Sequence, residues 1–365
     1  MAEYRLPGHE ARQARPTDYE NRLNRRWIKS MSKLKTVGSY QSEMTLRETE
    51  RAIKLIKDTF EVQLANALNL ERISAPLFVR TDSGLNDDLN GVERPVSFDL
   101  KCDGSSAVIV HSLAKWKRMA LKAYGFSEGE GLYTDMNAIR RDEELDNLHS
   151  IYVDQWDWER IITPHERTMD FLCQTVRKIS SCICQTLSEI RAVFPSLPTL
   201  LKEEVFFVSS QELEDQYPGL SPKQRERACA REHRTIFITQ IGDNLKSGIR
   251  HDGRAPDYDD WALNGDLLYW NDVLEDVFEI SSMGIRVNAA SLKSQLEKSG
   301  TTDRMKYPYH QQIASEQLPL TIGGGIGQSR LCMLLLQKAH IGEVQVSIWP
   351  EDMLDECEKA GMVIL

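Results

Sequence analysis

The sequence lacks the features that mark secreted, membrane and zinc-binding proteins. Its apolar runs all stay well short of the roughly 18 residues that a transmembrane helix needs. The N-terminus has no apolar segment of the signal-peptide type. The seven cysteines are an odd number without framework spacing, and no Cys/His cluster has the spacing of a zinc site. These absences predict reduced thiols, no membrane segment and a cytoplasmic protein.

The acidic charge of the chain is unevenly spread. The net charge is −10, yet residues 1–40 contain nine Lys and Arg against four Asp and Glu, a net of +5. An acidic body argues against a large nucleic-acid surface, so we expect no nucleic-acid partner. The basic leader has few apolar residues, which predicts a disordered extension over 1–44 and one domain over 45–365. A weak targeting or RNA-contacting role is the alternative for the leader.

Glycine is concentrated near the end of the chain. The segment 321–337, TIGGGIGQSRLCMLLLQ, holds four glycines within a span of five residues. It matches neither the dinucleotide fingerprint nor the Walker phosphate loop. Leu331, Leu334 and Leu335 recur at helical spacing, so we predict a glycine turn that feeds a helix with Arg330 in its first turn. Such a helix start favours an anion; a buried turn with a salt-bridged arginine is the alternative.

The remaining periodicity predicts the fold class. Thr45 opens a capping box and a helix that should reach about Leu68. Pro76 predicts an extended strand in RISAPLFV. Residues 150–162 alternate but carry polar groups on both faces, which predicts a strand that lines a polar cavity. Residues 265–287 read as a long hairpin. We therefore expect an α+β fold, an antiparallel sheet flanked by helices, rather than a doubly wound sheet.

Two pairs of charged residues stand out as candidate sites. Asp266 and Glu279 lie on opposite strands of the predicted hairpin, where both carboxylates could meet on one face. Facing carboxylates repel unless a cation lies between them, and Mg²⁺ fits such a pair. Two outward-facing edge acids are the alternative. Arg140 and Glu143 lie three residues apart near a loop, which on its own is usually a solvated charged turn.

Two larger sets are less distinctive. A helix-like run around Trp116 carries the cations Lys115, Lys117 and Arg118, as an amphipathic surface helix also would. Four scattered residues could bind an ammonium group, although such residues are mostly on the surface: Asp87, Gln155, Asp157 and Asp259.

Taken in order, three motifs resemble those of class II aminoacyl-tRNA synthetases. Pro76 after a long helix matches the first motif, Arg140 with Glu143 the second, and Arg330 after the glycines the third. Further stretches, among them HSLAKWKR, SIYVDQWDWER, RAPDYDDW and TIGGGIGQSRL, are similar to ammonia-dependent asparagine synthetases, the aspartate–ammonia ligases. The resemblance covers about residues 46–350. The basic leader and a short stretch between Trp261 and Leu263 depart from the bacterial pattern.

The resemblance implies a synthetase-like catalytic domain over 45–365 that forms a homodimer. Its reaction would convert aspartate, ATP and ammonia to asparagine, AMP and pyrophosphate through a β-aspartyl adenylate. Arg140 would hold the α-phosphate, and Arg330 would meet the γ-phosphate and lie over adenine. Magnesium on Asp266 and Glu279 would bridge phosphate oxygens. The resemblance assigns the nucleotide site to these residues: Arg140, Glu143, Gly325, Gly327 and Arg330.

The same resemblance implies an aspartate site with opposite charges at its two ends. Candidates for the α-ammonium are Asp87, Gln155 and Asp157, and candidates for the carboxylates are the cations Lys117 and Arg286. Three hydroxyls could supply hydrogen bonds to the substrate: Ser112, Ser281 and Ser282. Asp259 could steer ammonium or take a proton as the amine attacks, because ammonium must lose a proton before it is a nucleophile.

Two alternatives stay open at this point. The first is an aspartyl- or asparaginyl-tRNA synthetase, which should carry a separate anticodon-reading domain. The second is an inactive synthetase paralogue that acts as a binding protein. Residue 2 is Ala and no Gly-x-Cys-x-Gly elbow occurs, so the chain shows no recognisable glutaminase. Free ammonia is therefore the expected nitrogen donor, with glutamine as the open alternative.

Overall fold

The computed structural model describes residues 34–87, 93–197 and 201–365, and Leu34–Leu365 form one compact unit. The predicted extension therefore lies mostly outside the described residues. Its last part, residues 34–44, contacts the rest of the unit: the amide of Lys35 donates to Asn147 Oδ1 at 2.7 Å, and the Tyr40 hydroxyl donates to Glu343 at 2.9 Å. The described unit thus begins eleven residues before the predicted boundary.

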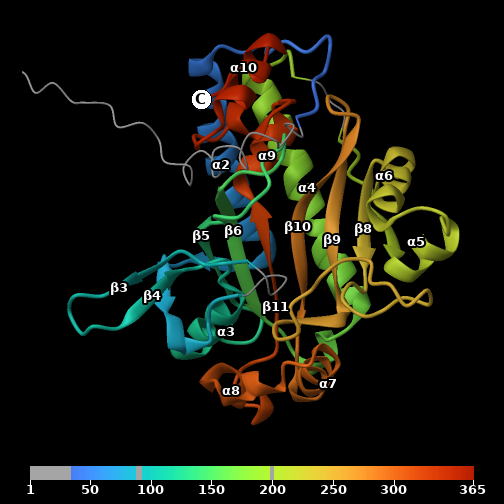
Figure 1. Cartoon of the computed structure of the whole chain (residues 1–365). Helices are drawn as coiled ribbons and strands as arrows, with labels where there is room; N and C mark the ends of the chain where they lie inside the picture. The colour runs from blue at the N-terminus through green and yellow to red at the C-terminus, as the bar shows by residue number, and fades with distance from the viewer. Residues whose placement is uncertain (1–33, 88–92, 198–200) are drawn as a thin grey trace, which may run out of the picture. The chain divides into compact units, whose positions relative to one another are not determined.

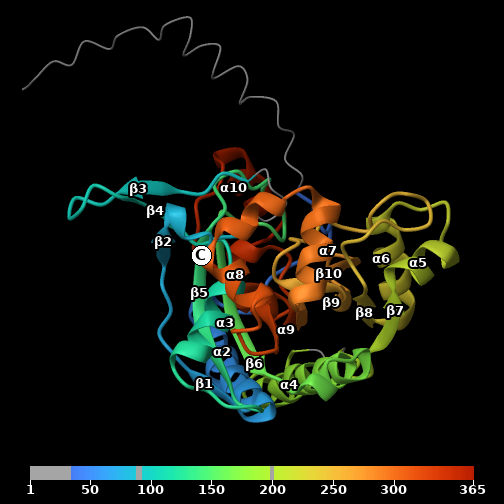
Figure 2. The ribbon, with the colours of Figure 1, turned by 90° about the horizontal axis from the view of Figure 1, so that it is seen from below.

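Two long helices cover one face of the unit. Helix α2 (Leu46–Leu68) begins with the predicted capping box at Thr45 and ends with Asn69 in the left-handed conformation. Helix α4 (Met169–Val193) packs beside it after a short 3-10 turn, η2 (Pro164–Glu166) (Figures 1 and 2). The buried face of α2 follows the helical repeat, with Ile56, Phe60 and Leu64 fully enclosed.

The helices cover an eight-stranded sheet with the order β1-β5-β6-β11-β10-β9-β8-β7. Its inner pairings are antiparallel, whereas the two edge pairs, β1 with β5 and β7 with β8, are parallel. The predicted antiparallel α+β fold is therefore confirmed. The strands are β1 (Leu70–Arg72), β5 (Gly131–Ile139), β6 (Tyr152–Ile161), β7 (Phe206–Ser209), β8 (Thr235–Thr239), β9 (Asp259–Asn271), β10 (Asp276–Arg286) and β11 (Thr321–Gly327).

Strand β6 mixes aromatic and polar residues because its two faces have different surroundings. Trp156 and Trp158 are fully buried in the main core, and the ring of Trp156 lies 4.8 Å from that of Phe60 on α2. Gln155 and Asp157 point to the opposite face, where they line a cavity. The predicted hairpin is also present, as β9 and β10.

The predicted strand around Pro76 is only partly correct. β1 ends at Arg72 in the main sheet, and β2 (Phe78–Arg80) starts a second sheet of three strands with the order β2-β4-β3. Pro76 lies in the extended link between the two, consistent with its lack of a backbone donor for a ladder. The other strands of this sheet are β3 (Ser97–Asp99) and β4 (Ser106–Ile109), and η1 (Thr81–Ser83) follows β2.

The predicted glycine turn is wrong, because the four glycines form strand β11 between β6 and β10. Neighbouring side chains leave no room there: a β-carbon on Gly324 would lie 2.5 Å from Met283 Cβ, and one on Gly325 would clash with Gln155 Oε1. The predicted helix follows directly as α9 (Gln328–Leu335), with its leucine face buried.

The other helices close the two ends and the far side of the sheet. They are α3 (Ala114–Ala123), α5 (Ser210–Gln216), α6 (Pro222–His233), α7 (Ala289–Ser299), η3 (Thr302–Lys306), α8 (Pro308–Ala314), η4 (Ile341–Glu343) and α10 (Glu351–Lys359). On α3, Lys115, Lys117 and Arg118 are buried, so this run is not the surface helix that was the alternative. Of the helices in the described ranges, none has both the length and the apolar character needed to cross a bilayer.

Candidate active site

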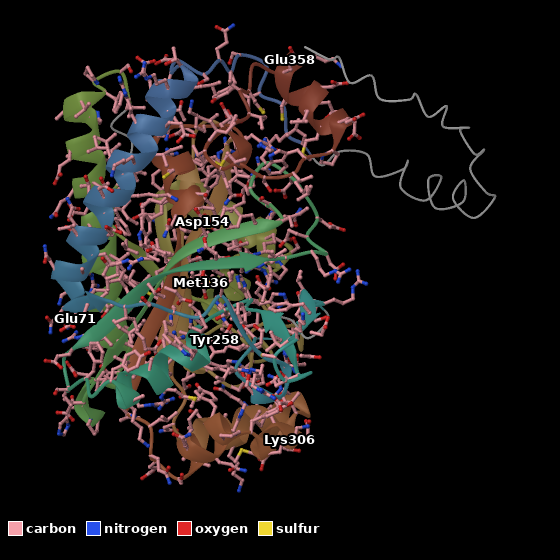
Figure 3. All side chains as sticks on the ribbon, turned by 90° about the vertical axis from the view of Figure 1, so that its left-hand side faces the viewer. Glu71, Met136, Asp154, Tyr258, Lys306 and Glu358 are labelled. Atoms are coloured by element: carbon pink, nitrogen blue, oxygen red, sulfur yellow. The ribbon has the colours of Figure 1, made fainter. Side chains whose placement is uncertain are left out.

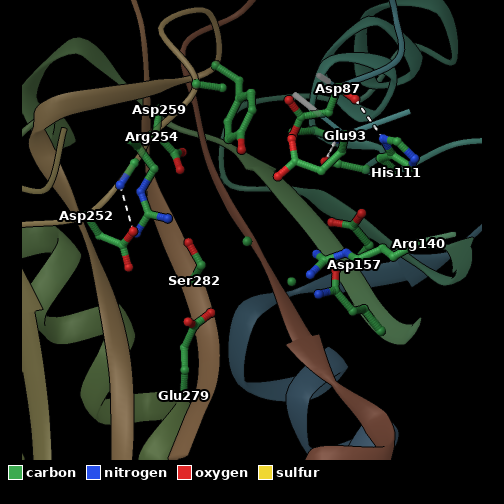
Figure 4. A pocket seen from close by; sticks show the side chains of 18 of the residues that line it. Asp87, Glu93, His111, Arg140, Asp157, Asp252, Arg254, Asp259, Glu279 and Ser282 are labelled. Carbon is green, nitrogen blue, oxygen red and sulfur yellow. Dashed lines mark hydrogen bonds between the residues drawn. The ribbon is translucent and has the colours of Figure 1, made fainter. Parts of the chain in front are cut away.

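The central strands carry a polar cavity of about 580 Å³, and a smaller one of about 160 Å³ shares part of its lining. In Figure 4, Arg140 and Asp157 face the larger cavity from one side of β11, and Arg254, Ser282 and Glu279 face it from the other. Five residues line both cavities: Arg140, Glu143, Gln155, Glu279 and Gly325. The two cavities therefore form one continuous site.

Arg140 and Arg330 meet at the smaller cavity although 190 residues separate them in the chain. Arg140 follows β5 directly, and its Nη1 lies 3.6 Å from Oε2 of Glu143. Arg330 extends from the first turn of α9, and its Nη1 donates to the backbone oxygen of Glu279 at 3.0 Å. Gly327, which precedes α9, lines the same cavity. The predicted nucleotide residues are thus brought together.

The predicted acid pair also lies at the site. Asp266 on β9 and Glu279 on β10 both line the larger cavity. Burial raises the pKa of Asp266 to about 6, and the negative charge of Glu279 contributes to the rise. Arg254, which the sequence did not single out, forms an ion pair with Asp266 and opposes this rise. Arg254 lies in the stretch RAPDYDDW, which leads into β9.

This donor set suits a hard divalent cation. Two carboxylates that repel each other at the edge of an open polar cavity leave room for oxygen atoms of a substrate, as Mg²⁺ prefers. Within the residues that the structure describes, no three His, Cys, Asp or Glu side chains form a metal-binding cluster. A metal at Asp266 and Glu279 would therefore need phosphate or water oxygens to complete its coordination.

A buried ionic chain forms the inner wall of the larger cavity. Arg286 Nη2 lies 2.7 Å from Glu159 Oε2, and Nη1 pairs with Asp259. Burial works to lower the pKa of Arg286, but the two carboxylates outweigh it and keep that pKa well above its usual value. The ring of Tyr258 lies 5.7 Å from the Arg286 guanidinium. Glu159 and Tyr258 were missed, since only their positions beside Arg286 and Asp259 in the fold give them a role.

Lys117 lies behind the cavity wall and is fully buried. Its Nζ pairs with Asp157 and donates to the backbone oxygens of Trp158 at 2.9 Å and Gly324 at 3.3 Å. Burial lowers its pKa, although Asp157 opposes that effect. Lys117 lines neither cavity. Its partner Asp157 lines the larger one instead.

Two of the three predicted hydroxyls reach the cavity. Ser112 and Ser282 line it, whereas Ser281 is buried and donates to the Gly325 backbone oxygen at 2.9 Å. Adjacent residues of β10 point to opposite faces, so both serines could not line the same cavity. Asp87 also lines it, and its backbone oxygen lies 3.2 Å from Nδ1 of His111, a lining residue that the sequence did not indicate.

The larger cavity is strongly acidic. Ten Asp and Glu residues line it against five Arg residues. Such a lining attracts cations, so a polyphosphate could bind there only at the arginines or together with a bound cation.

The chain is similar to known proteins both in sequence and in fold. A family profile described as aspartate–ammonia ligase matches residues 47–361. An aspartate–ammonia ligase of Ruminiclostridium cellulolyticum is 59% identical over 336 residues, covering 92% of this chain and all of that protein. One from Clostridium tetani is 58% identical over 339 residues, covering 93% and 99%.

Solved structures show the same fold at low sequence identity. Asparaginyl-tRNA synthetase from Pyrococcus horikoshii, complexed with asparaginyl-adenylate, has a TM-score of 0.61 at 15% identity, covering 83% of this chain and 70% of that one. Asparaginyl-tRNA synthetase from Entamoeba histolytica has a TM-score of 0.57 at 15% identity, covering 82% and 67%.

Proposed function

The chain belongs to the aspartate–ammonia ligase family, and from this membership we propose the chemistry of its site. The enzyme converts aspartate, ATP and ammonia to asparagine, AMP and pyrophosphate through a β-aspartyl adenylate. The observation that carries the assignment is identity of 56–59% to aspartate–ammonia ligases over at least 88% of the chain. The convergence of Arg140 and Arg330 on one cavity supports it.

The first step must bring an anionic carboxylate against an anionic triphosphate. Arg140 holds the α-phosphate at the reacting end, and Arg330 holds the γ-phosphate and lies over adenine. Glu143, Gly325 and Gly327 complete the nucleotide site. The lining of the two cavities supports this proposal, because Gly324, Gly325 and Gly327 of β11 all contribute to it.

Asp266 and Glu279 would hold Mg²⁺ next to the triphosphate. The bound metal would supply charge neutralisation for the departing pyrophosphate. Arg254 pairs with Asp266 and would hold its carboxylate in place at the cavity wall.

Aspartate binds between the acidic and basic walls of the larger cavity. Asp87, Gln155 and Asp157 receive its α-ammonium, Arg286 receives a carboxylate, and Ser112 and Ser282 add hydrogen bonds. We assign Lys117 to holding Asp157 in place rather than to direct contact, and Ser281 to the backbone of β11. Asp259 steers ammonium to the adenylate and accepts its proton.

We also propose a single catalytic domain that forms a homodimer in the cytoplasm. The segment of α2 and Pro76 matches the synthetase motif that builds a two-fold interface, and β1, which follows α2, is the edge strand of the main sheet within the described residues. Sedimentation at micromolar concentration tests the dimer, and a monomer mass would contradict it.

One assay tests the function directly. The purified chain with aspartate, ATP and Mg²⁺ should form AMP and asparagine in equal amounts with ammonium as donor, and far less with glutamine. The same sample should not charge tRNA with aspartate or asparagine. Formation of aminoacyl-tRNA would favour the tRNA synthetase that the fold also resembles, and no AMP from a folded sample would favour an inactive paralogue.

A further inference from the structure

The first turn of α9 is held in place from outside the helix. Its N-cap is Gly327, which has no side chain to bond the free amides of the turn. Arg330 extends from this turn, and its guanidinium donates to the Glu279 backbone oxygen at 3.0 Å. The position of its guanidinium therefore depends on what fixes the two residues just before it, Gln328 and Ser329.

One polar chain reaches Ser329 from helix α2. The buried carboxylate of Asp154 on β6 (labelled in Figure 3) accepts from the Ser329 amide at 3.0 Å. Its other oxygen lies 3.1 Å from Nζ of Lys57 on α2. Gln345 joins the network, donating to the Ser329 hydroxyl at 2.9 Å and to Asp154 at 3.3 Å. Asp154 thus supplies the cap that Gly327 lacks, at the helix end where a negative charge is favourable.

A second polar chain reaches Gln328 from strand β1. The Gln328 side-chain amide donates to Asp135 Oδ1 at 2.9 Å. The other oxygen of Asp135 accepts from Nη2 and Nε of Arg72 at 2.8 and 3.1 Å. The two chains run from different elements, yet they end on adjacent residues of one helical turn.

We propose that Asp154 and Asp135 are positioning residues for Arg330, and that they link the α2–β1 segment to the nucleotide site. This inference rests on the proposed contact of Arg330 with ATP. Because Gln328 and Ser329 are both held, the first turn of α9 can neither shift along the helix axis nor rotate about it. The Arg330 side chain therefore keeps its direction. Asp154 borders the smaller cavity with both oxygens already bonded, whereas Asp135 lines neither cavity. An effect of Asp135 on ATP cannot then come from direct contact.

Calorimetric titration with Mg²⁺ and ATP tests the proposal on the full chain. Asp154→Asn and Asp135→Asn should each weaken ATP binding by about tenfold, as expected for a displaced contact group. Their KM for aspartate should stay near the wild-type value. Asp58→Asn is the matched control, because this exposed carboxylate on α2 pairs with Lys54 one turn away on the same helix; it should change neither quantity.

A double-mutant cycle separates this role from a general loss of structure. In the Arg330→Ala background, neither substitution should weaken ATP binding further. Equal weakening in both backgrounds would overturn the inference and leave the proposed function standing. If Arg330→Ala alone binds ATP as the wild type does, the proposed role of Arg330 falls and the inference falls with it. Should Asp154→Asn fail to fold, the more exposed Asp135→Asn carries the same test.

Discussion

Gly323 on β11 faces Glu159 on β6 so closely that a β-carbon at position 323 would collide with the Glu159 carboxylate. The same β-carbon would lie 2.6 Å from Nη2 of Arg286. The absence of a side chain at this position is therefore what allows the Glu159–Arg286–Asp259 chain to form beneath the cavity.

Gly323→Ala should accordingly damage the site. The new methyl group must push Glu159 or Arg286 aside, and misplacement by about 1 Å can lower a rate by about a hundredfold. Measurement of kcat and of KM for aspartate checks this. Gly219→Ala, where a β-carbon meets nothing within 4 Å, is the control and should keep full activity. Wild-type kinetics in Gly323→Ala would show that the ionic chain tolerates movement.

Removing the Arg330 guanidinium should remove adenylate formation. Arg330→Ala loses the fixed positive charge that we propose to face the triphosphate, and such a loss typically lowers the rate by about a hundredfold or more. Arg330→Lys restores charge without the planar fork and should recover only part of the rate. Aspartate-dependent exchange of pyrophosphate into ATP measures the step. Near wild-type exchange in a folded Arg330→Ala sample would refute the role given to Arg330.

Magnesium binding should compete with a proton at Asp266. The pKa of Asp266 is raised to about 6, mainly by burial, so this carboxyl is protonated below pH 6 and ionised above it. Affinity for Mg²⁺ should therefore fall as the pH drops from 7 to 5, and adding the metal near pH 6 should release protons. Titration calorimetry in two buffers measures both effects.

The matched variants identify the carboxyl responsible. Asp266→Asn should abolish the proton release. Asp243→Asn removes an exposed carboxylate that pairs with Lys298 and should leave the release unchanged. Proton release that persists in Asp266→Asn would assign it to another group.

His340 should make the fold sensitive to acid. It is fully buried, and burial lowers its pKa to about 4 from an ordinary 6.5. Because the folded pKa lies below the unfolded one, the stability it confers is complete above pH 6.5 and is lost as pH falls towards 4. The shift corresponds to about 3 kcal/mol in the free energy of unfolding.

Urea unfolding at pH 7, 5 and 4 measures this loss. His340→Asn should flatten part of the pH profile, since Asn can still accept the hydrogen bond that the Gly342 amide donates to the His340 ring at 3.0 Å. His165→Asn, at an exposed histidine, should leave the profile unchanged. An unaltered slope in His340→Asn would place the acid sensitivity elsewhere.

The elements that the sequence predicts well are those whose sequence patterns lie within a few neighbouring residues. The capping box at Thr45 and the alternation along β6 identify α2 and the cavity strand directly. The glycines of β11 were wrongly predicted to form a turn, because a cluster of glycines is expected both in a turn and in a strand against which neighbouring side chains pack closely. The neighbours that demand them, Glu159 and Met283, lie far away in the chain.

The candidate site shows the same division. Arg140 and Arg330 were predicted because their order along the chain matches a known family, and Asp266 and Glu279 because the predicted hairpin places both carboxylates on one face. Arg254 was missed and Lys117 was given a direct contact, since burial and pairing depend on which elements pack together. A sequence shows which charges exist, but not which of them neutralise one another.

The place of β11 in the middle of the sheet has a consequence for its motion. Hydrogen bonds tie this strand to β6 on one side and to β10 on the other, so its amides can meet solvent only when the sheet separates. In deuterium exchange, the stretch richest in glycine should thus be among the last to take up label. Slow exchange there would mean that the segment richest in glycine is held among the most firmly in the fold.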